Sequence, residues 1–455
     1  METKKTKKDT KGSKEHKKNW QEQTATVADI RAFLDERILL RHNVVTGRVE
    51  CCWPTVYPDD PPSAWEPITD RAVNSLWSEM SKQKTVRVQD MQRVIESDYV
   101  ADFDPFRFYL TRLPPWNDDK DDYIMELAMS VVVKGGAEEQ LLFCQCLKKW
   151  LVGMVAGWID AQVVNNVILV LIGAQGSYKT TWFSYLLPPE LRSYFRIKTN
   201  ASRMTKDDLL ALTQYGLVCY EELDTMGNRE LNELKSAVTM PTIDERPAYG
   251  RYHEHRRHLA SFCGTGNNVQ FLNDPTGNRR WLPFEVDTIQ SPLMFPFNYA
   301  GIYSQARRLY RDGFQYWFSQ SEIQRLNSHN RQFETPRLET ELVDIYFRKP
   351  NEHETGEFMP VARAMQIIGG NTTQKLSPIM IGRAFMELGY ECRRTNHSRG
   401  YIVVQRSGLE IKERMKDMAV TGDGWFPGNA TRTVRAVREI LYSFYLSSVT
   451  CHPYH

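Results

Sequence analysis

The sequence from Val167 to Phe183, VILVLIGAQGSYKTTWF, passes from an apolar run through two glycines to a lysine and two threonines. This arrangement is typical of a strand, a tight loop and a helix that bind phosphate groups. The loop offers its backbone N–H groups, and the helix adds its N-terminal dipole. Tyr178, however, stands where the usual pattern has its last glycine. The stretch alone is therefore equally compatible with a plain strand, turn and helix.

We assign the residues of this loop by their position in the pattern. The lysine would reach the β- and γ-phosphates, and Thr180 would bind Mg²⁺ through its hydroxyl. A tyrosine tolerates positive φ poorly, so we expect Tyr178 to keep an ordinary backbone conformation while donating its N–H. The predicted nucleotide-binding residues are Gly173, Gly176, Ser177, Tyr178, Lys179, Thr180 and Thr181.

A second apolar strand, Leu217 to Tyr220, ends in the carboxylates of Glu221 and Glu222. An ATPase that uses an activated water needs one carboxylate for the Mg²⁺ shell and a neighbour that orients or deprotonates the water. We assign the metal to Glu221 and the water to Glu222, which is therefore a predicted catalytic residue. Standing alone, the pair would be better explained as two surface acids at a strand end.

A third apolar strand, in LASFCGTGNNVQFL, ends in polar residues, of which Asn267 would lie between the acids and the γ-phosphate. Shortly afterwards, DPTGNRRWLPFEV places Arg279 and Arg280 on a turn before another strand. An arginine on a turn can stabilise the transferring phosphoryl group, in trans if subunits form a ring. Asn267, Arg279 and Arg280 are thus predicted catalytic residues, although a structural salt bridge would explain one of the two arginines.

Two segments combine features of nucleic-acid binding. In DERPAYGRYHEHRRHLAS, basic side chains alternate with aromatic rings, as binding to a phosphate backbone and stacked bases requires. After residue 337 the pattern indicates helix, helix and hairpin, the order of a winged-helix module whose second helix or wing contacts a duplex. An exposed charged hairpin is the alternative for the first segment. The predicted DNA-binding residues are Arg246, Tyr249, Arg251, His253, Arg256, Arg257, Arg393, Arg394 and Arg399.

Taken together, these motifs resemble the virulence-associated protein E family. The family's acidic strand end, its R-x-P-Y-G-R-like stretch, its G-T-x-N strand end and its D-P-T-G-N-R-R-[FW] turn have counterparts here in the same order, within about residues 103–287. Tyr178 departs from the family pattern, and so does the spacing in RPAYGR, which leaves the register of the DNA-contacting tyrosine open. Residues 347–406 resemble a small uncharacterised domain that often follows in Bacteroides-type proteins.

Members of this family resemble superfamily 3 and poxvirus-type replicative helicases and occur in prophages and mobile islands. The resemblance implies ATP and Mg²⁺ as cofactors, single- or double-stranded DNA as partner, and a homo-oligomeric ring, such as a hexamer. Many relatives carry a primase ahead of the ATPase. The stretch before Phe103 is too short for one, so a separate chain would have to supply priming.

The resulting fold class is an α/β P-loop NTPase core of AAA+ or superfamily 3 helicase type, flanked by a helical N-terminal domain and a C-terminal winged-helix-like domain. We expect a basic disordered tail in residues 1–22 and a mainly helical region in 23–160. The ATPase core would span 161–336, the winged-helix-like domain 337–412, and a C-terminal tail 413–455. The lysines of the first segment could equally attract nucleic acid or merely solvate the chain.

Composition sets the broad class. The chain has 455 residues and a net charge of only +2, so no global basicity indicates nucleic acid. Its eight cysteines lack the paired spacing of a zinc site and suit a reducing compartment. The N-terminus lacks the apolar segment of a signal peptide, and the apolar runs look too short to span a bilayer. We therefore expect a cytoplasmic bacterial protein with no membrane partner.

The expected function is that of an ATP-dependent DNA helicase or translocase in the replication of a prophage or mobile element. The alternative is a replication initiator or regulator that uses ATP as an assembly switch without unwinding DNA. Glu222 distinguishes the two functions, because a protein that uses ATP only as a switch needs no carboxylate to activate water. A small-molecule kinase is disfavoured by the basic hairpin and the winged-helix-like segment.

Overall fold

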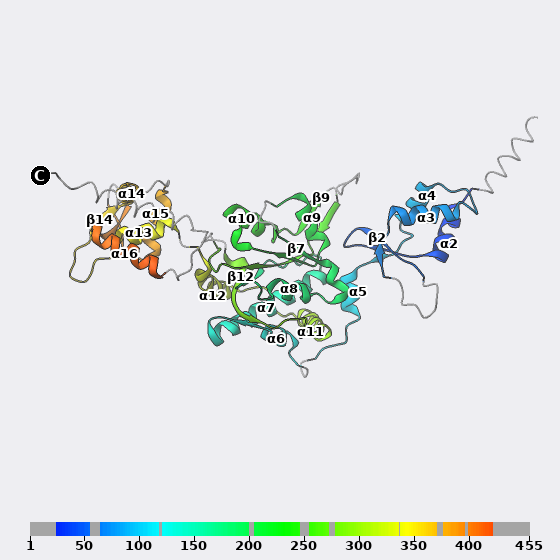
Figure 1. The fold of residues 1–455 in the computed structure, drawn as a ribbon, viewed down its shortest axis with the longest axis horizontal. Helices are drawn as coiled ribbons and strands as arrows, with labels where there is room; N and C mark the ends of the chain where they lie inside the picture. Colours follow the sequence, from blue (N-terminus) through cyan, green and yellow to red (C-terminus); the bar gives the residue numbers. More distant parts are fainter. Residues whose placement is uncertain are drawn as a thin grey trace, which may run out of the picture. The chain divides into compact units, whose positions relative to one another are not determined.

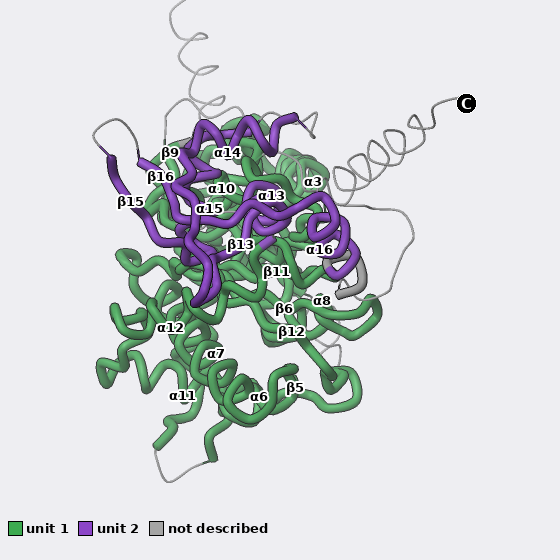
Figure 2. The backbone as a smooth tube through the Cα atoms, turned by 90° about the vertical axis from the view of Figure 1, so that its left-hand side faces the viewer, with its two compact units in different colours: residues 1–334 green, residues 335–455 purple. Residues whose placement is uncertain are grey.

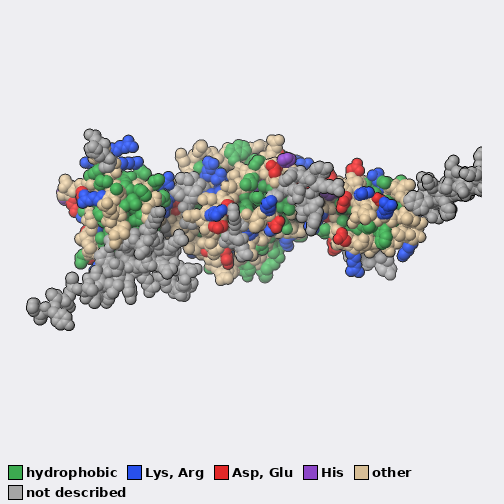
Figure 3. Space-filling model, turned by 90° about the horizontal axis from the view of Figure 1, so that it is seen from above, with side chains coloured by type: hydrophobic (Ala, Val, Ile, Leu, Met, Phe, Trp, Pro, Cys, Tyr) green, Lys and Arg blue, Asp and Glu red, His purple; other side chains and the backbone are tan. Residues whose placement is uncertain are grey.

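The computed structural model describes residues 24–54, 64–117, 121–199, 204–245, 254–272, 278–335, 337–370, 376–395 and 399–421. They form a mixed α/β protein with several sheets. The chain divides into two compact units, residues 1–334 and 335–455 (Figure 2). The division lies close to the predicted boundary at 336. Acidic and basic side chains are interspersed on the face drawn in Figure 3, in keeping with the small net charge.

The first part of unit 1 contains a small sheet, with strand order β3-β2-β1-β4. Strands β1 and β2 form a hairpin, and Gly47 adopts φ +67° at its turn. Asn43 joins this sheet to the rest of the unit, because its amide donates to the Tyr194 hydroxyl at 2.6 Å. The elements are α2 (Val27–Arg37), β1 (Leu39–Asn43), β2 (Arg48–Cys52), β3 (Glu66–Pro67), α3 (Asp70–Met80), α4 (Val88–Ile95), β4 (Asp102–Phe103) and α5 (Pro105–Thr111).

The rest of unit 1 is built on a six-stranded sheet of order β5-β12-β6-β11-β8-β7. Every neighbouring pair is parallel except β12 with β5. Ile168, Val170 and Ile172 face one core and Leu169 and Leu171 the other, which is why this strand reads as a continuous apolar run. The strands are β5 (Val131–Val133), β6 (Ile168–Ile172), β7 (Phe195–Lys198), β8 (Leu217–Tyr220), β11 (Ser261–Gly266) and β12 (Trp281–Ile289).

Helices cover both faces of this sheet (Figure 1). One core includes side chains of α6, α7, α8 and α11, and the other includes side chains of α9 and α10. A hairpin, β9–β10, is inserted between α10 and β11. The elements are α6 (Tyr123–Met129), α7 (Gly136–Ile159), α8 (Lys179–Leu186), η1 (Pro189–Tyr194), α9 (Lys206–Gln214), η2 (Leu223–Thr225), α10 (Asn228–Ala237), β9 (Thr242–Glu245), β10 (Glu254–Arg257), η3 (Asn278–Arg280), α11 (Tyr299–Arg311), α12 (Gln320–Asn330) and η4 (Arg331–Phe333).

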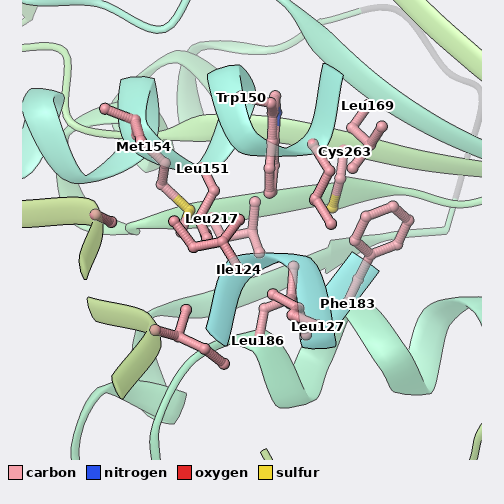
Figure 4. Packing of buried hydrophobic residues seen from close by; sticks show 14 of the residues in the cluster. Ile124, Leu127, Trp150, Leu151, Met154, Leu169, Phe183, Leu186, Leu217 and Cys263 are labelled. Atoms are coloured by element: carbon pink, nitrogen blue, oxygen red, sulfur yellow. The ribbon is translucent and has the colours of Figure 1, made fainter. Parts of the chain in front are cut away.

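Helix α7 lies at the centre of the first of these cores (Figure 4). Trp150, Leu151 and Met154 are completely buried, and the Trp150 indole N–H donates to the Phe262 carbonyl at 3.0 Å. With 24 residues, α7 is the one helix in the described ranges long and apolar enough to cross a membrane, contrary to our expectation. Its most apolar window is 78% buried within the protein, as in an ordinary core helix.

The structure departs from the predicted division of the chain in two places. Helices do make up most of the regular structure in residues 23–160, but these residues also contain the small sheet, and their C-terminal part belongs to the large sheet through β5 and α7. The reason is that α7 buries its apolar surface against the sheet, so the boundary at 160 does not separate two cores. Likewise, the boundary at 412 falls inside α16, because Met415 still packs into the core of unit 2.

Unit 2 has its own core, to which four described helices, a hairpin and flanking strands contribute. Its second and third helices and the hairpin occur in the predicted order, and β16 pairs with β13, β14 and β15. The elements are α13 (Leu338–Tyr346), β13 (Phe347–Arg348), β14 (Glu357–Pro360), α14 (Val361–Gly369), α15 (Pro378–Glu387), β15 (Cys392–Arg394), β16 (Arg399–Gln405) and α16 (Gly408–Thr421).

Candidate active site

Three loops carrying the predicted site residues meet at the carboxyl edge of the large sheet. Strand β11 lies between β6 and β8 and is parallel to both. The segment 173–178 after β6, Asn267 after β11, and the two glutamates after β8 therefore emerge at the same edge. The N–H of Gly173 donates to the Gly266 carbonyl at 3.1 Å, which continues the pairing of β6 and β11 into the loops.

Lys179 is the first residue of α8, and its side chain folds back over the loop that precedes it. Its Nζ atom donates to the carbonyls of Gly173 at 2.8 Å and Ala174 at 2.7 Å, and lies 3.4 Å from Asn267 Oδ1. The residue is buried, and burial lowers the pKa of its ammonium, an effect that nearby Asp224 opposes. A cation is therefore held at the centre of the three loops.

The two predicted metal-binding residues are in direct contact. The Thr180 hydroxyl donates to Glu221 Oε1 at 2.7 Å, and the Glu221 N–H donates to the Lys198 carbonyl at 3.0 Å. A hydroxyl and a carboxylate are oxygen ligands of the kind that Mg²⁺ prefers, so the residues present fit this ion. Glu222, the predicted water-activating residue, is exposed at the same strand end.

A carboxylate that the sequence reasoning missed connects the loops. Asp224 accepts the backbone N–H groups of Asn267 and Asn268, both at 3.2 Å. Glycines allow this close approach: a Cβ on Gly266 would lie 3.0 Å from Asp224 Oδ1, and one on Gly264 only 2.1 Å from Leu223 Cδ1. The sequence does indicate this residue, since Asp224 is the third acidic residue in the run EELD that follows β8.

Tyr178 does not keep the ordinary conformation that we expected. It adopts φ +62° and ψ +13°, the left-handed conformation, where the usual glycine would be unstrained. Glu222, at φ +55°, is the only other non-glycine residue with positive φ in the described part of the chain. Such strain, about 1–2 kcal/mol per residue, tends to concentrate at functional sites.

Arg279 and Arg280 lie at the opposite edge of the sheet. They form η3 immediately before β12, and Trp281 pairs with Ile168 at the start of β6. Strand β6 rises about 3.3 Å per residue, which separates them from Gly173 by roughly 17 Å. The structure therefore does not bring the arginines to the lysine and acids of their own subunit. Burial lowers the pKa of Arg280, and the charge of Arg279 lowers it further.

The predicted DNA-binding residues of the β9–β10 hairpin divide into two groups. Arg246, Tyr249, Arg251 and His253 lie outside the described residues. Arg256 and Arg257 are engaged within the protein. Arg257 pairs with Asp104 at 3.3 Å and donates to the Trp158 carbonyl at 3.4 Å. Arg256 pairs with Glu254 at 2.7 Å. These contacts favour a structural role for this second group.

The hairpin of unit 2 carries the remaining predicted DNA-binding residues, which are Arg393, Arg394 and Arg399. All three are exposed. Arg393 pairs with Glu391 at 2.9 Å, and Arg399 contacts the sulfur atoms of Cys392 and Met386, each at 3.2 Å. The guanidinium groups therefore lie on a solvent-facing hairpin next to the end of α15.

Residues 111–335 match the family model described as the virulence-associated protein E-like domain. The chain therefore carries a domain of this family, as its motifs indicated. The match spans the large sheet, the three loops and the arginine turn.

Among solved structures, the chain is similar to the apo structure of the NrS-1 C-terminal region, with 12% identity over 83% of this chain and 98% of that chain, at a TM-score of 0.45. The A form of the same apo region gives 12% identity over 82% and 98%, at a TM-score of 0.43. No curated protein matches this chain. At these TM-scores the likeness carries no conclusion about activity.

The backbone strain at Tyr178 can be measured by comparing two variants. Tyr178→Ala removes the ring but keeps a Cβ in the left-handed conformation, whereas Tyr178→Gly relieves the strain. We expect the glycine variant to be more stable than the alanine variant by about 1 kcal/mol. The measurement is urea unfolding followed by fluorescence. An alanine variant as stable as the glycine variant would contradict a strained conformation at this position.

Proposed function

We propose that this protein is a P-loop NTPase of AAA+ or superfamily 3 helicase type that hydrolyses ATP to unwind DNA or move along it. The observation that carries the proposal is the position of β11 between β6 and β8, with the Lys179–Asn267 contact and the Thr180–Glu221 contact at one sheet edge. The strained backbone of Tyr178 and Glu222 at the same edge supports it. The biological setting would be replication of a prophage or mobile element in the bacterial cytoplasm.

The loop and helix α8 would bind the triphosphate. Backbone N–H groups from Ala174 to Thr180 would donate to the phosphate oxygens, aided by the N-terminal dipole of α8. The ammonium of Lys179, which contacts the carbonyls of Gly173 and Ala174, is within reach of a phosphate placed against the loop. Burial of the lysine strengthens its interaction with such an anion.

The carboxylates of Glu221 and Glu222 would have different roles in hydrolysis. Thr180 and Glu221 would hold Mg²⁺, which neutralises charge that develops on the phosphate oxygens. Glu222 would orient the attacking water and accept its proton. Asn267 would hold the γ-phosphate between lysine and acids, and Asp224 keeps the Asn267 backbone in place.

The arginines would complete the site of a neighbouring subunit. In their own subunit they are separated from the loop by the full length of β6, which disfavours a contact in cis. In a homo-oligomeric ring, one copy can present its amino edge to the carboxyl edge of the next. Arg279 or Arg280 would then stabilise the phosphoryl group in trans.

Unit 2 would contribute to DNA binding. The order α13, β14, α14, α15 and the β15–β16 hairpin is that of a winged helix, in which a helix or wing contacts the duplex. The exposed hairpin arginines Arg393, Arg394 and Arg399, together with Arg383 on the exposed face of α15, suit phosphate contacts. In unit 1, the tip of the β9–β10 hairpin stays the predicted contact for single-stranded DNA. Priming would come from a separate chain.

ATP turnover with and without single-stranded DNA tests the proposal. We expect turnover that DNA stimulates, and displacement of a labelled strand from a forked duplex. Lys179→Ala should abolish turnover and strongly weaken nucleotide binding, because it removes the cation at the centre of the loops. Lys82→Ala, which changes an exposed lysine, is the matched control and should leave turnover intact. Normal turnover by folded Lys179→Ala would remove the P-loop assignment.

The different roles proposed for Glu221 and Glu222 predict that their substitutions impair different steps. Glu222→Gln should still bind ATP but hydrolyse it about 10²-fold or more slowly, as expected when a general base is lost. Glu221→Gln should weaken binding of Mg²⁺–ATP, because it removes a partner of Thr180. Single-turnover hydrolysis and fluorescent-nucleotide titration measure the two quantities. Full turnover by Glu222→Gln would contradict its assignment as the general base. A parent protein that binds ATP but does not turn it over would favour the alternative function, an ATP-switched initiator or regulator that does not unwind DNA.

Mixing experiments test the arginines. Arg279→Ala and Arg280→Ala should both bind ATP, and at least one should hydrolyse it poorly as a pure assembly. Adding Lys179→Ala subunits should restore part of the turnover, since they supply the missing arginine to an intact pocket. ATPase rates at several mixing ratios provide the measurement. Absence of rescue in assemblies that light scattering shows to be mixed would contradict the trans contact.

A further inference from the structure

An exposed apolar segment follows β12 at the carboxyl edge of the large sheet. Leu293, Met294 and Phe295 are consecutive residues with exposed fractions of 62%, 76% and 62%. We call them the apolar tip. Strand β12 passes the nucleotide loop on its way to this segment, because a Cβ on Gly173 would lie 3.2 Å from the Val286 carbonyl oxygen. The tip and the proposed ATP site therefore belong to the same edge.

A cavity of about 240 Å³ lies at the opposite, amino edge. We call it the aromatic pocket. Apolar side chains and the arginine turn both contribute to it, and Trp317 is 58% exposed. Its principal lining residues are Val167, Thr239, Arg279, Arg280, Trp317 and Ile323. The pocket can accommodate a large apolar side chain beside two cationic groups.

Charge and hydrophobicity are complementary between these two edges. Among the described residues no acidic side chain pairs with Arg279 or Arg280, whereas Glu221, Glu222 and Asp224 lie at the carboxyl edge. Within the described residues the two surfaces lie at opposite ends of the strands, so neither packs against the other. Two complementary patches at different places on one molecule define a head-to-tail contact, which repeats into a ring or a filament.

We propose that the apolar tip of one copy inserts into the aromatic pocket of the next copy. This inference rests on the proposed function, since the same contact places Arg279 and Arg280 near the neighbour's ATP. It adds the residues that hold the subunits together. Because the arginines line the pocket itself, insertion of the tip fixes their position relative to the neighbouring nucleotide. The partner is therefore a second copy of this chain.

Disulfide cross-linking tests the contact without measuring turnover. The background carries Cys392→Ser and Cys451→Ser, because Cys392 is exposed and Cys451 lies outside the described residues. Met294→Cys protein is mixed with Thr239→Cys protein, with Mg²⁺–ATP and without it, oxidised mildly and run on a non-reducing gel. We expect a cross-linked dimer from the mixture and little from either protein alone. Ile197→Cys, exposed on β7, replaces Thr239→Cys as the control and should not cross-link.

A second measurement uses the tip variant Leu293→Ser, Met294→Ser and Phe295→Ser. We expect it to sediment as a monomer at concentrations where the parent protein assembles, while it still binds ATP. Failure of the cysteine pair to cross-link, or a tip variant that assembles like the parent, overturns the inference. If the parent protein hydrolyses ATP but the cysteine pair does not cross-link, only the tip contact is contradicted. If the pair cross-links but the parent protein does not hydrolyse ATP, only the proposed ATPase activity is contradicted. A parent protein that stays monomeric in every condition also overturns the inference.

Discussion

The parallel pairing of β11 with both β6 and β8 is the constraint on which the candidate site depends. It brings a lysine, a threonine–glutamate pair and an asparagine from separate stretches of the chain to one edge. Since all three strands are buried on both faces, their register is fixed by packing against helices on each side. Helix α7 contributes much of that packing, and its burial explains an apolar length that would otherwise suit a membrane span.

Contacts from neighbouring strands hold the strained residues of the site in place. Tyr178 and Glu222 adopt left-handed backbone conformations, each followed at once by a helical segment. Leu223, directly after Glu222, packs so tightly against β11 that Gly264 cannot carry a Cβ. Asp224 then binds two backbone N–H groups at the end of that strand. The strained residues are thus held by contacts from neighbouring strands, which is the usual way in which such conformations persist.

The direction of the strands gives the molecule two different edges. The carboxyl edge has the lysine, the acids and the apolar tip, whereas the amino edge has two arginines and an aromatic pocket. In the described part of one copy these groups lie at opposite ends of β6 and β12, with the sheet between them. Head-to-tail assembly would bring them together, and it would make phosphate chemistry depend on the neighbouring subunit. Unit 2, with its exposed hairpin arginines, would add a DNA contact.

The sequence alone determined four strands of the large sheet, which are β6, β8, β11 and β12, as well as the loop with its lysine and the order of acids, asparagine and arginines. These follow from apolar runs and the polar residues that end them, which are local features. Only the tertiary structure decided the left-handed conformation of Tyr178, the role of Asp224, the engagement of Arg257 with Asp104, and the opposite location of Arg280. Each depends on strand order or on contacts between distant residues, which periodicity along the chain does not encode.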